Sequence, residues 1–242
     1  MKQKLCLITG GSKGIGKEIV INLSKKGYLV AFTYNKNKNS SLQLEKKYHN
    51  VKGFKINMKD KKKLKKLINN IESFYSKKID VLINNAAIAQ EKEFQKISIS
   101  DVEEMFAINF IAPFFLSQQV IANMKKKRWG RIVNISSIGG QWGGVNQPHY
   151  AASKAALINF TKSLSKLHSK DGILSNCISI GLVKTDMSKD EISRKDGKRK
   201  VQNIPLGRVG SPSEISKIIE FLITDDSSYI TGQIINANGG MI

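Results

Sequence analysis

Two kinds of hydrophobic pattern alternate along the chain. Short apolar runs such as Leu5-Cys6-Leu7-Ile8 are typical of strands that are buried on both faces of a sheet. Longer segments repeat apolar residues at helical spacing, as Ile15, Ile19 and Leu23 do. The short runs predict strands near residues 4–9, 28–34, 51–56, 79–84, 131–136, 173–179 and 231–236. The longer segments predict helices near residues 14–26, 40–48, 60–76, 101–127, 149–169 and 212–223.

This alternation of strands and helices specifies the fold class. Each strand–helix–strand unit adds two parallel strands to one sheet and packs the connecting helix on a face of it. We therefore predict an α/β fold, a doubly wound sheet of seven parallel strands with helices on both faces. The 242 residues include only four prolines and no Gly/Ser-rich linker, so one domain over residues 1–242 is expected.

A glycine-rich turn joins the first predicted strand to the first helix. It reads Thr-Gly10-Gly-Ser12-Lys13-Gly14-Ile15-Gly16, and a strand, glycine turn and helix in this order are typical of dinucleotide binding. The first glycine would permit the tight turn, the second the approach of a pyrophosphate, and the third close helix–strand packing. Free N–H groups at the helix start would face the phosphates. A turn with a purely structural role is the alternative.

The residues after the second strand bear on the choice between NAD and NADP. A carboxylate about 20 residues beyond the glycine turn would bind the ribose 2′-hydroxyl. No Asp or Glu lies between Glu18 and Glu45, whereas Lys36 and Lys38 follow the strand and Lys13 lies in the turn. Cations at this place attract a 2′-phosphate, which predicts NADP(H). The alternative is that these lysines are solvated loop charges.

Tyr150 and Lys154 form a candidate acid–base pair, and Ser137 precedes the tyrosine by thirteen residues. Residues at i and i+4 share one face of a helix. A free phenol has a pKa near ~10, and an adjacent ammonium favours the phenolate and lowers that pKa towards the working pH. Ser137 would donate a hydrogen bond to the substrate oxygen as charge develops. By itself the pair could be an ordinary surface Tyr and Lys.

Polar side chains end two of the predicted strands. Asn84 and Asn85 end the strand near 79–84, and Ser136 and Ser137 end the strand near 131–136. Open α/β sheets bind ligands at the carboxyl ends of their strands. The glycine turn, the amides and the serines are therefore predicted to meet at one edge of the sheet.

Two segments are candidates for the substrate side of the site. Gln141 and Trp142 precede the helix that carries Tyr150 and are expected to line it; packing of Trp142 against a neighbouring subunit is the alternative. Residues 184–210 are polar with few apolar positions, and we predict a mobile lid that orders when the cofactor binds. An unremarkable surface excursion is the alternative for this segment.

Composition excludes several other functions. The formal charge is +21, but the lysine excess is spread along the chain rather than gathered in a tail, so no nucleic-acid partner is predicted. Such a surface would still steer acidic partners. The two cysteines are isolated and the three histidines lack ligand spacing, so no disulfide and no metal are expected. The first apolar run is too short for a signal peptide or a membrane span, which predicts a soluble cytoplasmic protein.

Together these motifs resemble the short-chain dehydrogenase/reductase family over essentially the whole chain. The matching segments are TGGSKGIG at 9–16, NNAA at 84–87, FAINF around Asn109, the Ser137, Tyr150 and Lys154 set, and IGLVKTDM at 180–187. Within the family the chain looks most like the 3-oxoacyl-[acyl-carrier-protein] reductases, on GRIVNISS at 130–137 and IPLGRVGSPSEI at 204–215. The resemblance implies a Rossmann fold, a homotetramer and a carrier-bound acyl substrate, with acyl carrier protein as a partner.

The resemblance also implies roles for individual residues. The catalytic set would be Asn109, Ser137, Tyr150 and Lys154, with Lys154 on the nicotinamide ribose and Asn109 stabilising a helix distortion. Asn57 stands where the family usually has Asp, and Ala87 and Ile180 replace a usual Gly and Pro. Residues expected to bind the cofactor are Gly10, Ser12, Lys13, Gly14, Ile15, Gly16, Tyr34, Asn35, Lys36, Asn57, Met58, Asn85, Ala86, Ala87, Tyr150, Lys154, Gly181, Val183 and Thr185. Residues expected to contact the substrate are Ser137, Gln141, Trp142 and Tyr150.

The predicted function is NADPH-dependent reduction of a carbonyl to a secondary alcohol, with a 3-oxoacyl thioester as the leading substrate. Because the same residues catalyse both directions, an NAD(P)-dependent dehydrogenase of a sugar, a polyol or another small secondary alcohol is the alternative. A cofactor-sensing or structural subunit is the non-enzymatic alternative, and the complete set of four catalytic residue types disfavours it.

Overall fold

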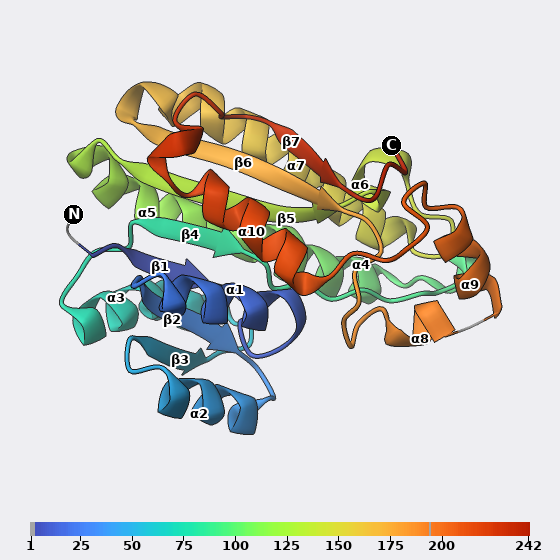
Figure 1. Cartoon of the computed structure of the whole chain (residues 1–242), viewed down its shortest axis with the longest axis horizontal. Helices are drawn as coiled ribbons and strands as arrows, with labels where there is room; N and C mark the ends of the chain where they lie inside the picture. The colour runs from blue at the N-terminus through green and yellow to red at the C-terminus, as the bar shows by residue number, and fades with distance from the viewer. Residues whose placement is uncertain (1–2, 194) are drawn as a thin grey trace.

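The computed structural model describes residues 3–193 and 195–242 (Figure 1). Within these residues one seven-stranded sheet has the order β3-β2-β1-β4-β5-β6-β7, and every neighbouring pair is parallel. The predicted doubly wound α/β fold is therefore confirmed. The strands are β1 (Leu5–Ile8), β2 (Leu29–Tyr34), β3 (Val51–Lys55), β4 (Val81–Asn84), β5 (Gly130–Ser137), β6 (Ile173–Ile180) and β7 (Ile234–Ala237).

Helices connect the strands and cover both faces of the sheet (Figure 1). The helices are α1 (Gly14–Lys25), α2 (Lys38–Lys47), α3 (Lys61–Tyr75), α4 (Ile99–Phe106), α5 (Ala112–Lys127), α6 (Gly139–Trp142), α7 (Pro148–His168), α8 (Lys189–Ser193), α9 (Lys195–Gln202) and α10 (Pro212–Leu222). A π-helical segment, η2 (Ala107–Ile111), joins α4 to α5. Short 3₁₀ turns are η1 (Phe94–Lys96), η3 (Ser169–Asp171) and η4 (Asp225–Ser227).

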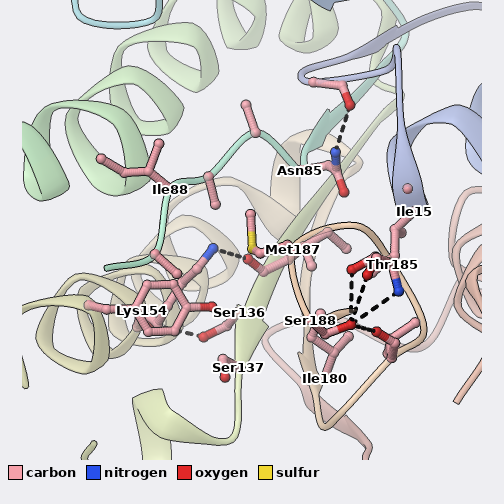
Figure 2. Close-up of a pocket in the computed structure, with 18 of the residues that line it drawn as sticks. Ile15, Asn85, Ile88, Ser136, Ser137, Lys154, Ile180, Thr185, Met187 and Ser188 are labelled. Atoms are coloured by element: carbon pink, nitrogen blue, oxygen red, sulfur yellow. Dashed lines mark hydrogen bonds between the residues drawn. The ribbon is translucent and has the colours of Figure 1, made fainter. Parts of the chain in front are cut away.

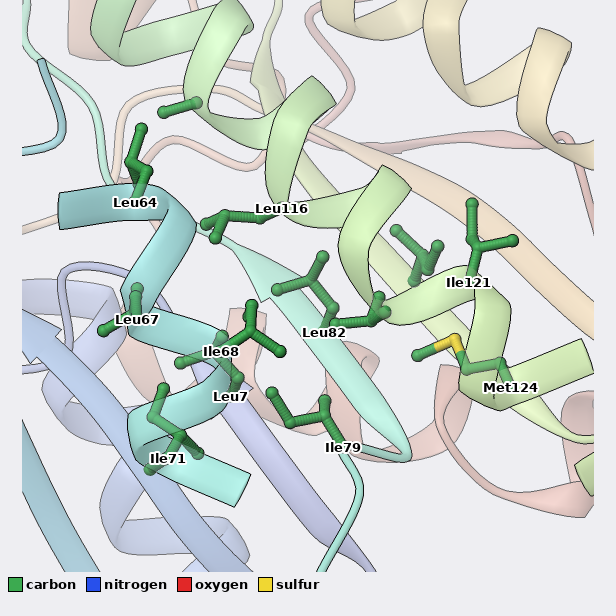
Figure 3. Close-up of a cluster of buried hydrophobic side chains, with 14 of the residues drawn as sticks. Leu7, Leu64, Leu67, Ile68, Ile71, Ile79, Leu82, Leu116, Ile121 and Met124 are labelled. Atoms are coloured by element: carbon green, nitrogen blue, oxygen red, sulfur yellow. The ribbon is translucent and has the colours of Figure 1, made fainter. Parts of the chain in front are cut away.

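The hydrophobic core has two layers because successive side chains of a strand point to opposite faces. Leu5 and Leu7 of β1 pack with α3 and α5, as Figure 3 shows for Leu7. Cys6 and Ile8 pack with α1 and α10 on the other face. All four side chains are fully buried. The continuous apolar runs of the sequence are thus strands covered on both sides.

The strand order reverses between β1 and β4. From β1 the chain proceeds through β2 to β3 on one side, and from β4 to β7 on the other. Loops that leave β1 and β4 therefore turn away from each other, and a crevice opens between them at the carboxyl edge. The polar strand ends that the sequence places together lie at this edge.

The predicted elements differ from the observed ones in several places, among them the short helix α6, which the apolar pattern does not predict. The predicted helix at 101–127 is divided into α4, η2 and α5, because Asn109 bonds outside the helix as described below. The last strand covers 234–237 rather than 231–236. Helices α8 and α9 occupy the polar segment 184–210, whose weak apolar periodicity did not predict them. Whether this segment is a mobile lid stays a prediction.

One stretch, Ile99–Lys127, is long and apolar enough to cross a membrane by length and composition alone. Half of its most apolar window is buried inside the protein, and η2 interrupts it. Buried core helices of soluble proteins share these properties. The absence of a membrane partner stays a prediction.

A charged aromatic cluster lies at the opposite, amino edge of the sheet. Arg131 of β5 is 3% exposed and forms an ion pair with Asp225 at 3.0 Å. Two cations lie over the Trp129 ring, Lys4 at 3.5 Å and Arg131 at 4.3 Å from its centroid, and its Nε1 donates to Asp225 at 2.9 Å. Burial lowers the pKa of Arg131, and Asp225 opposes that effect. This cluster anchors η4 to β5, away from the crevice.

Candidate active site

A cavity of about 1020 Å³ occupies the crevice at the carboxyl edge of the sheet. This volume is at the upper end of the range of about 300–1,000 Å³ for ligand pockets, so it can hold a dinucleotide and a substrate. Figure 2 shows part of its lining: Lys154 and Ser137 lie at the lower left, Thr185 and Ser188 lie to their right, and Asn85 and Ile15 lie above Thr185 and Ser188. Most of the lining comes from the segments that follow β1, β2, β3, β4, β5 and β6 and from the first turns of α7.

The glycine turn after β1 forms the floor of the dinucleotide half. Gly10 and Gly14 have φ of +70° and +53°, which side chains rarely tolerate. A Cβ on Gly16 would lie 2.1 Å from the Gly10 carbonyl oxygen, so a side chain there is incompatible with the turn. The first helical turn of α1 begins at Gly14, and the side chain of Lys13 does not cap it. Its N–H groups are therefore available to phosphates, and the turn fits a dinucleotide.

Asn85 after β4 fixes the shape of this turn. Its Nδ2 donates to the carbonyl oxygens of Thr9 and Gly10 at 2.9 and 3.2 Å, while Thr9 Oγ1 accepts from the backbone of Asn85 and Ala86. The neighbouring Asn84 turns the other way and donates to Asn134 Oδ1 at 2.8 Å inside the protein. The two adjacent amides therefore have different roles: Asn85 holds the glycine turn at the cavity, and Asn84 forms a hydrogen bond inside the protein.

Lys154 is buried in the cavity lining near Tyr150. Its side chain is 3% exposed, and its Nζ donates to the Ile135 carbonyl oxygen at 2.8 Å. Burial lowers its pKa from 10.5 to about 8, and the Coulomb effect of Cys177 opposes that change. The Nζ lies 5.8 Å from the centroid of the Tyr150 ring. A cation whose protonation changes near neutral pH therefore lies next to the phenol, as acid–base chemistry requires.

The two serines at the end of β5 have separate roles. Ser137 lines the cavity, and its Oγ accepts from the Gly139 backbone N–H at 3.2 Å. Ser136 is 1% exposed and donates to the Lys154 carbonyl oxygen at 2.9 Å, which ties α7 to β5. Because α7 carries Tyr150 and β5 carries Ser137, this bond holds the two sides of the site together.

Asn109 is fully buried in the π-helical segment η2. Its Oδ1 accepts from the Ile88 N–H at 3.0 Å, and its Nδ2 donates to the Ile88 carbonyl at 2.9 Å and to Ser153 Oγ at 3.0 Å. Ser153 in turn donates to the Tyr150 carbonyl at 2.7 Å. The helix distortion therefore directs one amide towards the loop after β4 and towards α7, behind the tyrosine. π-Bulges often occur at functional sites.

The structure brings most of the predicted site residues together around one cavity. All nineteen residues expected to bind the cofactor line the cavity, as do Ser137 and Trp142. Asn109 lies behind the wall. Gln141 is not among the lining residues; its Oε1 accepts from Ser179 Oγ at 2.9 Å. Lining residues that the motifs did not predict include Ile88, Met187, Ser188, Lys200, Asn203, Ile204 and Met241. Ser188 completes the turn at Thr185 by accepting from its N–H at 3.1 Å, a contact that no spacing in the sequence indicates.

Comparison with known proteins identifies the family. The family model described as Enoyl-(Acyl carrier protein) reductase matches residues 10–242. Proteins named 3-oxoacyl-[acyl-carrier-protein] reductase are similar over the full chain. The relative from Aquifex aeolicus is 37% identical, with 100% of this chain and 98% of the relative covered. The chain belongs to the short-chain dehydrogenase/reductase family. A reductase of that name from Buchnera aphidicola is 39% identical over the same shares of the two chains, and one from Rickettsia conorii is 38% identical over 99% of this chain and 97% of the relative.

Membership in this family makes the chain an oxidoreductase that uses a nicotinamide cofactor. The glycine turn and the uncapped start of α1 fit that group. Among the described residues, no group of three or more His, Cys, Asp or Glu side chains is placed to hold a metal ion.

Proposed function

We propose that this reductase converts the 3-oxo group of an acyl thioester into a secondary alcohol, using NADPH. The observation that carries the proposal is that Tyr150, Ser137 and the buried Lys154 border the same cavity as the dinucleotide turn. The relatives named 3-oxoacyl-[acyl-carrier-protein] reductase, similar along the whole chain, support the substrate class and indicate a role in fatty acid biosynthesis.

In the proposed reaction the cofactor contributes the hydride, and residues of the chain contribute the proton and the hydrogen bonds. The bound nicotinamide supplies a hydride to the carbonyl carbon. Tyr150 donates its phenolic proton to the carbonyl oxygen, and the Ser137 hydroxyl donates a hydrogen bond to that oxygen as charge develops. The hydride and the proton together convert the ketone into the alcohol.

Lys154 stabilises the phenolate that Tyr150 leaves behind. Its Nζ lies 5.8 Å from the centroid of the phenol ring, and a nearby cation favours the charged form of the phenol. We propose that the same buried amine also binds the ribose of the cofactor. Asn109 positions these groups through Ile88 and Ser153 without touching the substrate.

The adenosine end of the cavity supports NADPH over NADH. Asn35 and Lys36 line the cavity after β2, and Lys13 lines it within the glycine turn. The acidic residues of the lining are Glu91 and Asp186, and neither belongs to β2 or to the turn that follows it. A 2′-phosphate at this place meets cations and no nearby carboxylate of the wall.

Three further features belong to the same proposal. An acyl carrier protein is the proposed carrier, since a basic protein surface attracts an acidic one. A homotetramer in the cytoplasm is the proposed assembly. An aromatic row on η2, α5 and α7, formed by Phe110, Phe114 and Phe160, has rings 4.8–6.0 Å apart and is partly exposed, which suits a subunit contact. The segment 184–210 is proposed to close over the substrate.

The assay that tests this proposal follows NADPH oxidation with acetoacetyl-CoA and repeats it with NADH. We expect turnover with NADPH and a preference of at least about tenfold over NADH, the effect of one charge-assisted contact. Tyr150→Phe should keep NADPH affinity and lose turnover, whereas Tyr229→Phe, which alters a fully exposed tyrosine, should behave as the wild type. Wild-type turnover in Tyr150→Phe would reject the mechanism. Oxidation of polyols without thioester reduction would reject the substrate class.

A further inference from the structure

The cavity lining has an apolar part beside polar side chains such as Gln147, Lys200 and Asn203. It includes two large side chains that water reaches: Trp142, which is 56% exposed, and Met187, which is 53% exposed. Figure 2 shows Met187 and Ile180 at the pocket beside Ser137. Exposed apolar side chains that line a functional cavity mark a place where an apolar ligand group is covered.

Both side chains come from loops that leave neighbouring strands. Ser137 ends β5 and pairs with Ile180, which ends β6. Trp142 follows the first of these strand ends by five residues, and Met187 follows the second by seven. The carbonyl-binding serine therefore lies at the base of the two loops that present the apolar groups.

The support beneath Trp142 is rigid. A Cβ on Gly140 would lie 2.8 Å from the Lys154 carbonyl carbon, so α6 packs directly on the backbone of α7. Gln141 faces β6, where its side chain accepts from Ser179, and this leaves the next residue, Trp142, to face the cavity. Gly143, at φ +88° with open space around it, ends the one-turn helix there. The indole is thus placed before substrate arrives.

The support beneath Met187 is similar. Ser188 accepts from the Thr185 N–H at 3.1 Å and donates to the Val183 carbonyl, which closes a tight turn around Met187. Val183, at the start of this turn, forms a parallel bridge with Gly210. A flexible thioether adapts to ligands of different length.

We propose that Trp142 and Met187 form an apolar clamp that holds the acyl chain of the substrate and sets a preference for medium over short chains. This proposal rests on the proposed 3-oxoacyl reductase function. The acyl chain is the favoured occupant because it is the apolar part of that substrate. It is bonded directly to the carbonyl with which Ser137 and Tyr150 are proposed to form hydrogen bonds.

The test compares acetoacetyl-CoA with 3-oxodecanoyl-CoA, whose acyl chain has six more methylenes. A buried methylene contributes about fourfold to affinity, so loss of the indole contact to about three methylenes costs up to roughly 60-fold. We expect Trp142→Ala to lower kcat/KM for the longer substrate by about 10- to 60-fold and to change the short one less than about twofold. Met187→Ala should act in the same direction by about fourfold to 16-fold.

Two variants control for folding and for loop changes in general. Trp142→Phe keeps an apolar ring and should restore most of the preference. Val145→Ala alters a 97% exposed residue of the same loop that is absent from the cavity wall and should leave both rates unchanged. Binding of decanoyl-CoA, which cannot be reduced, gives a readout independent of turnover: its affinity should fall in Trp142→Ala and hold in Val145→Ala.

The outcomes separate this proposal from the one it rests on. If Trp142→Ala lowers kcat/KM equally for both substrates, Trp142 contacts the CoA arm or maintains the shape of the whole site, and the clamp is overturned. Unchanged kcat/KM for both substrates would overturn it as well. If the wild type reduces neither thioester, the proposed function itself fails and the clamp fails with it.

Discussion

Replacing the buried Lys154 should make the cofactor-free protein more stable. Burial lowers the Lys154 pKa from 10.5 to about 8, so at pH 7 the folded chain holds an ammonium that is poorly solvated. The difference between these values corresponds to about 3 kcal/mol of folding free energy, at about 1.4 kcal/mol per pKa unit. Lys154→Met removes that cost, keeps the apolar stem and loses one hydrogen bond worth about 1 kcal/mol. The expected net gain at pH 7 is about 2 kcal/mol.

The pH dependence gives this prediction its sign. Between pH 8 and 10.5 the unfolded wild-type chain binds more protons at this lysine than the folded chain does, so its free energy of unfolding rises with pH. The methionine variant lacks this contribution. Its advantage should therefore shrink from about 2 kcal/mol at pH 7 to about zero at pH 10.

Urea denaturation of both proteins at pH 7 and pH 10, followed by circular dichroism, measures the effect. Lys162→Met on the same helix is the matched control, since its side chain is exposed, and it should shift stability by no more than about 0.5 kcal/mol at either pH. A Lys154→Met protein that is less stable than the wild type at pH 7, by a margin unchanged at pH 10, would refute the reasoning. The expected gain in stability should accompany a loss of turnover, because Lys154 is proposed to stabilise the Tyr150 phenolate.

Three further changes test other parts of the structure. Gly16→Ala places a methyl 2.1 Å from the Gly10 carbonyl oxygen, so calorimetry should show NADPH affinity reduced by at least about tenfold; wild-type affinity would contradict the described turn. Asp225→Asn weakens the partner of the buried Arg131 and should lower the free energy of unfolding by about 1–3 kcal/mol in urea at pH 7, and an unchanged midpoint would count against the ion pair. Asn109→Ala leaves the buried backbone bonds to Ile88 unmade and should cost about 2–4 kcal/mol with a lower Tm, which an unaltered melting curve would disprove.

The comparison of prediction and structure is clearest at the ends of the strands. The apolar runs and the glycine turn predict the sheet, the parallel direction of its strands and the edge where ligands bind. All three depend on local periodicity and on general rules for α/β units. The same reasoning could not separate Asn84 from Asn85. Which amide supports the cavity depends on the neighbours that β1 and β5 supply, and these are far away in sequence.

The helix around Asn109 shows the same limit. Its apolar spacing predicts one long helix over 101–127. The helix distortion at Asn109 is expected only from the resemblance to the family. In the structure Asn109 bonds to Ile88 on one side and to Ser153 on the other. A π-helical turn is stabilised by tertiary partners rather than by propensity, so only the assembled fold decides where it lies.

The sequence by itself determined the alternation of strands and helices, the residues of the dinucleotide turn and the tyrosine–lysine pair, because each is a matter of short-range spacing. Tertiary structure alone decided that Lys154 is buried with its pKa lowered to about 8, that Gln141 turns to β6, and that Trp142 and Met187 meet the same cavity. Burial, and the solvation and contacts that follow from it, depend on which distant segments pack together, and no local pattern carries that information.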